Sequence, residues 1–457
     1  MTVEAEDMNA AASNSYMIES SSTDPDHQWV GYFESGSHLC YDDIDMTGVR
    51  SIDFQYAREG GLASFQIVLD DPQNGPVLAE QQTEATGGWS TFQNMNVGLD
   101  EQVQGRYRLC FVGNFGSGIF NLDYFSLSDL EGTNTGPIGD SGEIPEGQNV
   151  PAITTQGNQV LFGGTPDSIA GMSLFWSTAS AEGAPLYTAE AVKGLKEDWG
   201  AELVRAAMGV DPTWDSGDPM TGYTLNEESK LANTLMVTEV VNAAIENGMY
   251  VIIDWHTHHA EDHTDAAIEF FSEMAEKYGE YNNVIYEIYN EPLRNVSWSS
   301  VIKPYAEEVI SAIRQHDEDN LIIAGTPTWS QRVDEASMDP INDVNVAYTL
   351  HFYAGTHGED VRGFARTALA NGIPLFVTEW GTTAADGGAT DRTVYTQETS
   401  AWMTFLRDNG ISHANWSLAV KDEEASALTP NASFDGEWSD SELTESGRLV
   451  KDIISNW

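Results

Sequence analysis

The chain has 457 residues, more than one average domain needs, and 41% of them are hydrophobic, which is ordinary for a folded protein. Its 72 acidic residues against 20 basic ones give a formal net charge of -52, which makes nucleic acid and anionic membranes poor partners. No apolar run approaches the ~20 residues that a membrane span needs. We therefore expect a globular protein, monomeric, with no nucleic-acid or membrane partner.

Residues 1–131 predict an all-β domain. Short strand-like runs alternate with Gly-Gly, Asn-Gly and Gly-Ser turn signals, and helical periodicity is absent. The clearest runs are 51–56, 64–69, 107–112 and 121–127. This pattern indicates a small β-sandwich of the jelly-roll kind. Cys40 and Cys110 both lie in strand-like runs of this domain, and the sequence leaves a disulfide and two buried free thiols equally open.

Residues 132–150 are rich in Gly, Pro, Ser, Thr, Asn and acids, and predict a linker. From residue 151 onward, strands and amphipathic helices alternate. The apolar runs are 169–176, 203–208, 250–255, 284–289, 321–324, 346–352, 375–377 and 413–418. Eight such units predict a (β/α)8 barrel over 151–457, and a doubly wound open sheet is the weaker alternative.

Polar residues follow these runs at the strand ends, the face on which barrel enzymes carry their sites. The fourth and seventh runs are each followed by a glutamate, Glu291 and Glu379. Glycoside cleavage needs two carboxylates, one to protonate the leaving oxygen and one to attack the anomeric carbon or activate a water. Surface acids would be the alternative in so acidic a chain. Arg205, His256 and His351 at further strand ends favour a site, because core packing does not explain them.

The motifs around these positions resemble glycoside hydrolase family 5, above all its bacterial-type endoglucanases, across 168–430. They are LVRAAMGV with Arg205, VIIDWHTHH with His256, YEIYNEP with Asn290 and Glu291, YTLHFYAGTH with His351 and Tyr353, FVTEWG with Glu379, and NWSLAVK with Trp416 and Lys421. The resemblance implies that Glu291 is the acid/base and Glu379 the nucleophile, about 5–5.5 Å apart as in retaining enzymes. It implies no cofactor for catalysis.

The resemblance also implies supporting roles. Asn290 would bond the sugar 2-hydroxyl, and His256 and His351 would orient carboxylates and sugar hydroxyls. Arg205 and Tyr353 near Glu379 would favour its ionised form, and the charge of Glu379 would help Glu291 to keep its proton.

Further substrate contacts are expected along the cleft. Trp416 resembles the family tryptophan under the sugar at the cleavage point, and Lys421 with Glu423 resembles the pair that bonds a distal glucose. Trp176 and Trp329 are candidates for neighbouring subsites, with core packing as the alternative for each tryptophan.

The run of residues 256–263 contains four histidines and two acids, and a zinc site is one interpretation of such a run. Because the family carries a similar turn that orients substrate, His258 is expected to bind substrate rather than a metal.

Motifs of the first domain resemble carbohydrate-binding module family 6. They are Val3–Glu6, Val30–Tyr32, Gly87–Trp89 and Asn121–Phe125. The resemblance implies a sugar ring held between Tyr32 and Trp89, with Asn121 bonding its hydroxyls. It also implies a structural calcium on Glu4, Glu6 and Asp123. Where the family usually has Gly-Asp-Trp, this chain has Gly36–His38 with serine between them, so a sandwich that binds no sugar is the alternative.

The sequence thus predicts a retaining endo-β-1,4-glucanase that acts on cellulose or a related β-glucan. A mannanase, xylanase or mixed-linkage glucanase on the same scaffold is one alternative, and a catalytically silent carbohydrate-binding protein is another. We expect a secreted protein. No signal peptide is visible at residues 1–3, however, so a cytoplasmic protein is the alternative. The charge favours a salt-loving source, because molar salt screens the self-repulsion that opposes folding, and a merely acidic secreted protein is the alternative.

Overall fold

The structure is a computed structural model that describes residues 2–8, 10–11, 17–20, 27–59, 63–115, 118–132, 144, 150–214, 217 and 219–457. The chain divides into two compact units, Met1–Glu143 and Ile144–Trp457. The predicted linker, 132–150, falls almost wholly outside the described residues. Within the described part, no helix has the length and apolar character that crossing a bilayer requires.

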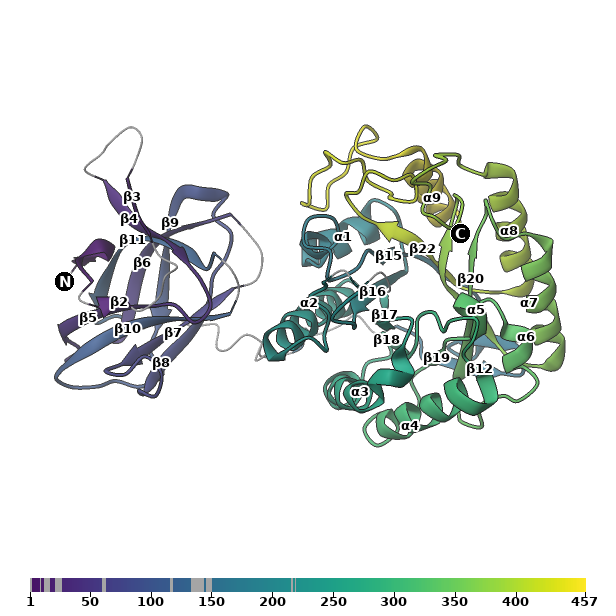
Figure 1. Ribbon diagram of the computed structural model, residues 1–457, viewed down its shortest axis with the longest axis horizontal. Helices are drawn as coiled ribbons and strands as arrows, with labels where there is room; N and C mark the ends of the chain where they lie inside the picture. Colours follow the sequence, from purple (N-terminus) through teal and green to yellow (C-terminus); the bar gives the residue numbers. More distant parts are fainter. Residues whose placement is uncertain are drawn as a thin grey trace. The chain divides into compact units, whose positions relative to one another are not determined.

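The first unit is an antiparallel β-sandwich, as predicted (Figure 1). One sheet has the order β3-β4-β11-β6-β9, with β1 paired to β11, and the other has the order β2-β5-β10-β7-β8. The strands are β1 Thr2–Glu4, β2 Ala10–Ala11, β3 Met17–Ser20, β4 Gln28–Phe33, β5 His38–Asp45, β6 Ser51–Arg58, β7 Ser64–Leu69, β8 Val77–Gln82, β9 Gly88–Gly98, β10 Arg106–Phe115 and β11 Phe120–Ser128. A short 3-10 turn, Ala5–Asp7, follows β1.

Aromatic side chains from both sheets form the core of the sandwich. Phe54 and Phe125 of one sheet meet Phe111 of the other edge to face, with ring centroids 4.9 and 4.8 Å apart. Such rings remove large apolar areas from water and fix their neighbours' orientation. Cys40 of β5 and Cys110 of β10 lie directly opposite each other and form a disulfide. The structure therefore has the disulfide rather than two free thiols.

The second unit is a closed eight-stranded parallel barrel, which confirms the predicted (β/α)8 fold. Its strands are β15 Ala170–Leu174, β16 Leu203–Gly209, β17 Tyr250–His256, β18 Val284–Glu287, β19 Ile322–Ala324, β20 Val346–Tyr353, β21 Leu375–Gly381 and β22 His413–Leu418. Helices surround them (Figure 1): α1 Ala189–Glu197, α2 Glu227–Glu246, α3 Thr264–Tyr278, α4 Lys303–Ile313, α5 Pro327–Ser330, α6 Val333–Ala336, α7 Glu359–Asn371, α8 Thr396–Asn409 and α9 Glu445–Ser455. Shorter turns lie at Ala184–Leu186, Ala260–His263 and Trp298–Ile302.

A small antiparallel sheet that the sequence pattern did not predict precedes the barrel. It consists of β12 Ile153–Gln156, β13 Gln159–Phe162 and β14 Thr165–Pro166. Ile153 and Val160 pack with Leu203, Ile252 and other residues from the starts of the barrel strands. The sheet therefore seals the N-terminal mouth of the barrel, and the opposite mouth is left for substrate.

Candidate active site

Glu291 and Glu379 meet at the C-terminal mouth of the barrel. Glu379 belongs to β21, directly beside His351 of β20, whereas Glu291 lies four residues beyond the last residue of β18. One oxygen of each carboxylate and one ring nitrogen of His351 all lie within 4.8 Å of one another. This separation fits a retaining pair of carboxylates and is too short for an inverting pair, which leaves room for a water.

Two hydrogen-bond donors hold Glu379. The hydroxyl of Tyr353 donates to its Oε1 at 2.6 Å, and Nη1 of Arg205 donates to its Oε2 at 3.2 Å. The carboxylate is nearly buried, with 4% of the residue exposed. Fixed donors on both oxygens orient the group toward the cleft.

Arg205 is fully buried and binds several acids at once. Its Nε donates to Glu287 at 2.7 Å, and its Nη2 lies 2.9 Å from Asp254 and 2.7 Å from the side-chain oxygen of Asn290. Burial disfavours the charge of Arg205, but Asp254, Glu287 and Glu379 outweigh it and raise its pKa. The guanidinium is thus permanently charged, and it orients both Glu379 and Asn290.

Two imidazoles hold Glu291. His351 lies 2.9 Å from its Oε1 through Nδ1, and His258 lies 3.2 Å from its Oε2 through Nε2. Burial opposes ionisation of Glu291, yet the bonds from His258 and His351 outweigh it and place its pKa well below the usual range. Burial likewise disfavours charge on His351, but Glu379, Glu287 and Glu291 raise its pKa to about 9.

The bonds from His258 and His351 thus act on the pKa of Glu291 in the direction opposite to that expected from the charge of Glu379. Nδ1 of His351 and Oε1 of Glu291 lie close enough to share one proton. His351 then donates through Nε2 to Thr378 at 2.9 Å, and Thr378 donates to Glu287 at 2.5 Å.

His256 does not orient either catalytic carboxylate, contrary to expectation. Its Nδ1 lies 2.7 Å from Asp254, and burial together with Arg205 lowers its pKa to about 3, so the ring is neutral. Its ring also stacks in parallel on Trp416, with centroids 5.1 Å apart, and meets Trp176 at a tilt, with centroids 5.3 Å apart. His256 therefore supports the indole ring that is expected beneath the sugar.

The histidine-rich turn holds no shared metal centre among the described residues. His256, His258 and His263 pair with three different carboxylates, those of Asp254, Glu291 and Asp211. The group of described residues whose ligand atoms do converge is Glu291, His351 and Glu379, where the carboxylates already have protein donors. The chemistry of the donors thus fits two catalytic carboxylates better than a resident metal.

A cleft of about 450 Å³ opens above the glutamates. Its lining residues are His258, Glu291, Arg294, Trp329, Gln331, His351, Tyr353, His357, Glu379 and Ala385. Trp329, a predicted substrate contact, stands in this wall beneath the guanidinium of Arg294, which is 5.8 Å from its ring. Arg294 and Gln331 were not predicted, because isolated loop residues carry no pattern.

The other predicted contacts lie nearby but outside that lining. Trp416 is 7% exposed, and Lys421 pairs with Glu423 at 2.9 Å. Trp176 stacks against Trp214, with ring centroids 3.5 Å apart, and Trp214 is 39% exposed. Trp214 was missed because it lies in a loop without periodicity.

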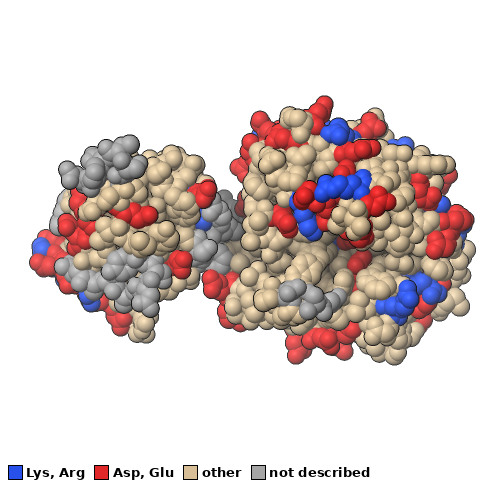
Figure 2. All heavy atoms as spheres, turned by 45° about the horizontal axis from the view of Figure 1, so that its top comes forward, with Lys and Arg blue, Asp and Glu red and all other residues tan. Residues whose placement is uncertain are grey.

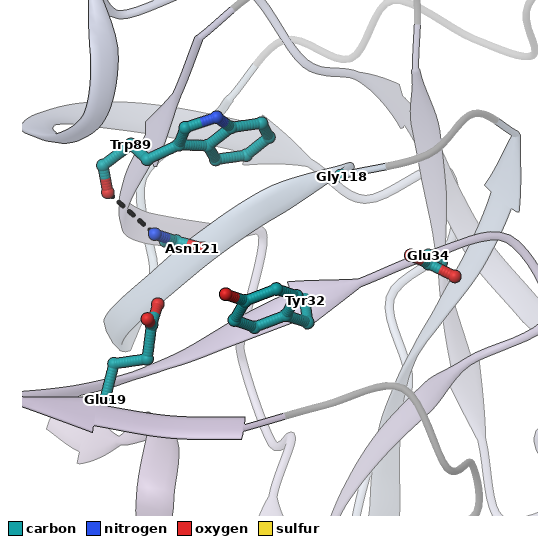
Figure 3. Close-up of a pocket in the computed structure, with 6 residues that line it drawn as sticks. All are labelled: Glu19, Tyr32, Glu34, Trp89, Gly118 and Asn121. Carbon is teal, nitrogen blue, oxygen red and sulfur yellow. Dashed lines mark hydrogen bonds between the residues drawn. The ribbon is translucent and has the colours of Figure 1, made fainter.

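In the first unit, Tyr32, Trp89 and Asn121 share one pocket of about 320 Å³, lined also by Glu19 and by Glu34 and Gly118. Figure 3 shows the two rings on either side, with Asn121 and Glu19 at one end. Asn121 donates to the carbonyl of Trp89 at 2.7 Å, which fixes the amide. Tyr32 is 55% and Trp89 37% exposed, so both rings are accessible to a ligand.

The predicted calcium ligands come from β1, the turn after it and β11, which pairs with β1, but their ligand atoms do not converge as those of the catalytic group do. Burial, and then the charges of Glu6 and Asp123, raise the pKa of Glu4. One oxygen of Glu6 is buried without a hydrogen-bond partner, whereas Asp123 pairs with His27 at 3.0 Å. An orphaned carboxylate oxygen among repelling acids fits a bound cation.

Comparison with known proteins identifies both units. The family model "Cellulase (glycosyl hydrolase family 5)" matches residues 155–422. The chain belongs to this family. The model "Carbohydrate binding module (family 6)" matches residues 4–129.

Individual relatives agree with the family 5 assignment. The chain is 56% identical to Endoglucanase Z of Dickeya dadantii over 310 residues, covering 68% of this chain and 67% of that protein. It is 46% identical to Endoglucanase A of Evansella cellulosilytica over 269 residues, covering 58% of this chain but only 52% of that protein. A solved structure of Thermobifida fusca endoglucanase Cel5A in complex with cellotetraose is 30% identical, with a TM-score of 0.59 over 66% of this chain and 97% of that one.

Proposed function

We propose that this protein is a retaining endo-β-1,4-glucanase that hydrolyses cellulose or a related β-glucan by double displacement. The observation that carries the proposal is the convergence of Glu291 and Glu379 within 4.8 Å at the open mouth of the barrel. Family 5 membership and the endoglucanase names of its relatives support the substrate class.

The reaction begins when Glu379 attacks the anomeric carbon as the glycosidic bond breaks. Tyr353 and Arg205 aim the attacking carboxylate. The leaving oxygen takes the proton that the Glu291–His351 pair holds. Glu291, left ionised by this proton transfer, then removes a proton from the water that hydrolyses the glycosyl–enzyme bond. Asn290, oriented by Arg205, bonds the sugar 2-hydroxyl, and the two carboxylates complete the cycle without a cofactor.

Product analysis on cello-oligosaccharides with detection of the anomeric configuration tests this proposal. We expect β-configured products first, and α-configured first products would contradict retention. The Lys421–Glu423 pair and Trp416 favour glucan, so activity on carboxymethylcellulose should exceed that on mannan, xylan and mixed-linkage glucan. A preference for mannan would overturn the substrate, and a wild type that cleaves none of these would favour a binding-only protein.

We assign the first unit to residues 1–131, the linker to 132–150 and the catalytic domain to 151–457. In this proposal the first unit tethers the enzyme to β-glucan. Tyr32 and Trp89 would stack on one sugar ring, and Asn121 would bond its hydroxyls. A structural calcium on Glu4, Glu6 and Asp123 would hold the N-terminal strand to β11, since β1 pairs with β11.

The protein is further proposed to be a secreted monomer from a salt-rich habitat. The Cys40–Cys110 disulfide supports secretion, because such bonds persist in oxidising compartments. Acidic side chains are spread over both units and basic ones are few (Figure 2), which supports adaptation to salt. Light scattering coupled to size-exclusion chromatography tests the monomer.

A further inference from the structure

The segment that carries Glu291 lies beyond regular strand structure. β18 ends at Glu287, and the next backbone bonds toward β17 are long. The N–H of Asn290 donates to the carbonyl of Trp255 in β17, and the N–H of Glu291 donates to the carbonyl of Thr257 just after β17, both at 3.3 Å. Protein N–H···O bonds cluster nearer 2.9–3.0 Å, so these two backbone bonds are loose, although the hydroxyl of Tyr289 also donates to the carbonyl of His258 at 2.8 Å.

Residues 325–330 include α5, whose backbone angles are largely not those of a regular helix, and we call them the bracing turn. They hold the same segment from the opposite side. The hydroxyl of Ser330 donates to the carbonyl of Asn290 at 2.7 Å. The backbone N–H of Trp329 donates to the carbonyl of Pro292 at 2.8 Å. These two acceptors flank Glu291 on either side, so its backbone is pinned at both ends by one turn.

The backbone of the bracing turn lies very close to the backbone of the segment before Glu291. A Cβ on Gly325 would lie 2.2 Å from the carbonyl oxygen of Tyr289, so only glycine allows the two backbones to approach. Thr328, Trp329 and Ser330 all have left-handed backbone angles, with φ of 62°, 52° and 54°. Side chains with a Cβ avoid this region, and such a run persists only where surrounding bonds impose it.

The hydroxyl of Ser330 is itself fixed. It accepts the backbone N–H of Thr326 at 3.2 Å while donating to Asn290, and the residue is fully buried. The same left-handed run projects Trp329 into the cleft wall. One short turn thus carries a sugar-stacking candidate and both restraints on the acid/base segment.

We propose that Ser330 is a positioning residue for proton donation by Glu291, a role that rests on the proposed glycosidase function. Its hydroxyl and the Trp329 N–H fix the backbone on both sides of Glu291. The Glu291 carboxyl is thereby held within hydrogen-bond distance of the leaving oxygen. A proton donor must lie within hydrogen-bond reach of the atom it protonates, so loss of this restraint impairs cleavage of poor leaving groups selectively.

Leaving-group dependence in the full chain tests the proposal. Cellotetraose has a sugar leaving group that needs protonation, whereas 2,4-dinitrophenyl β-cellobioside releases a stable anion that does not. For Ser330→Ala we expect kcat/KM on cellotetraose to fall about tenfold or more, while that on the dinitrophenyl substrate stays within about twofold. Ser330→Gly, which lacks the hydroxyl but tolerates positive φ, should show the same selective loss.

Ser337→Ala is the matched control, because Ser337 is a nearby buried serine whose hydroxyl donates to Asp334 of α6 and not to the site. It should leave both rates unchanged. An equal loss on both substrates in the Ser330 variants, or no loss on either, would overturn the positioning role. A wild type that cleaves neither substrate would instead refute the proposed function, so the two failures are distinguishable.

Discussion

Nδ1 of His351 lies 2.9 Å from Oε1 of Glu291, close enough for the two groups to hold one proton between them. The neighbouring acids Glu379, Glu287 and Glu291 overcome the burial of His351 and raise its pKa to about 9. The pair therefore keeps its proton at neutral pH and loses it as the pH rises through that value. A protonated pair is what cleavage of a sugar leaving group needs.

The alkaline limb of activity should report this proton. We expect kcat/KM on cellotetraose to fall as the pH rises above about 9, because the deprotonated pair cannot supply the leaving oxygen. The dinitrophenyl cellobioside, which needs no proton, serves as the control and should show no such limb. Identical alkaline limbs for the two substrates would assign the fall to unfolding or to another group.

Deprotonation of His351 should also lower the stability of the folded protein. The folded pKa of His351, about 9, lies above its ordinary unfolded value of ~6.5, so its contribution is fully present below pH ~6.5 and disappears as pH rises through about 9. This contribution is at most about 3 kcal/mol. The melting temperature should therefore fall over this range, and fall less steeply in His351→Gln. Equal slopes in both proteins would show that His351 does not titrate as described.

Salt should stabilise the protein. The net charge of -52 opposes the compact state, and ions screen that repulsion. We expect the melting temperature to rise by roughly 5 °C or more between low salt and molar salt, equally for NaCl and KCl. A flat or falling curve would remove the salt-habitat proposal and leave the catalytic one intact.

Calcium removal should destabilise the first unit. Chelation by EGTA should lower its melting temperature, and CaCl2 should restore it while MgCl2 does not, because Mg2+ demands a tighter octahedral shell. Glu6→Gln should abolish the response, since the unpartnered oxygen of Glu6 is a proposed ligand. Glu101→Gln, a change of an exposed acid in the same unit, is the control. A response to EGTA that survives Glu6→Gln would place the ion elsewhere.

Cellulose binding should depend on the pocket of the first unit. Trp89→Ala removes one of its two rings and should weaken adsorption to insoluble cellulose about tenfold or more, as loss of a buried aromatic anchor does. Hydrolysis of soluble cellotetraose should not change. Val77→Ala alters an exposed side chain of β8 outside the pocket, and should bind like wild type. Unchanged adsorption of the Trp89 variant would favour a sandwich that binds no sugar.

The barrel could be predicted because its strands are continuous apolar runs, as parallel strands buried on both faces must be. The position of Glu379 followed from strand ends alone. The resemblance placed Arg205 beside Glu379, but its pairing with Glu287, 82 positions away, could not be foreseen, because only closure of the barrel brings the two together. Asp254 and Glu287 were missed for the same reason, since an acid inside an apolar run has no partner until the strands assemble.

Trapping the nucleophile tests the central claim most directly. A 2-deoxy-2-fluoro β-cellobioside with a dinitrophenyl leaving group should form a glycosyl–enzyme bond that turns over slowly, and peptide mass spectrometry should locate the added sugar on Glu379. Attachment to any other residue would contradict the assignment of the nucleophile. Failure to form an adduct, together with α-configured first products from cellotetraose, would contradict the retaining pair itself.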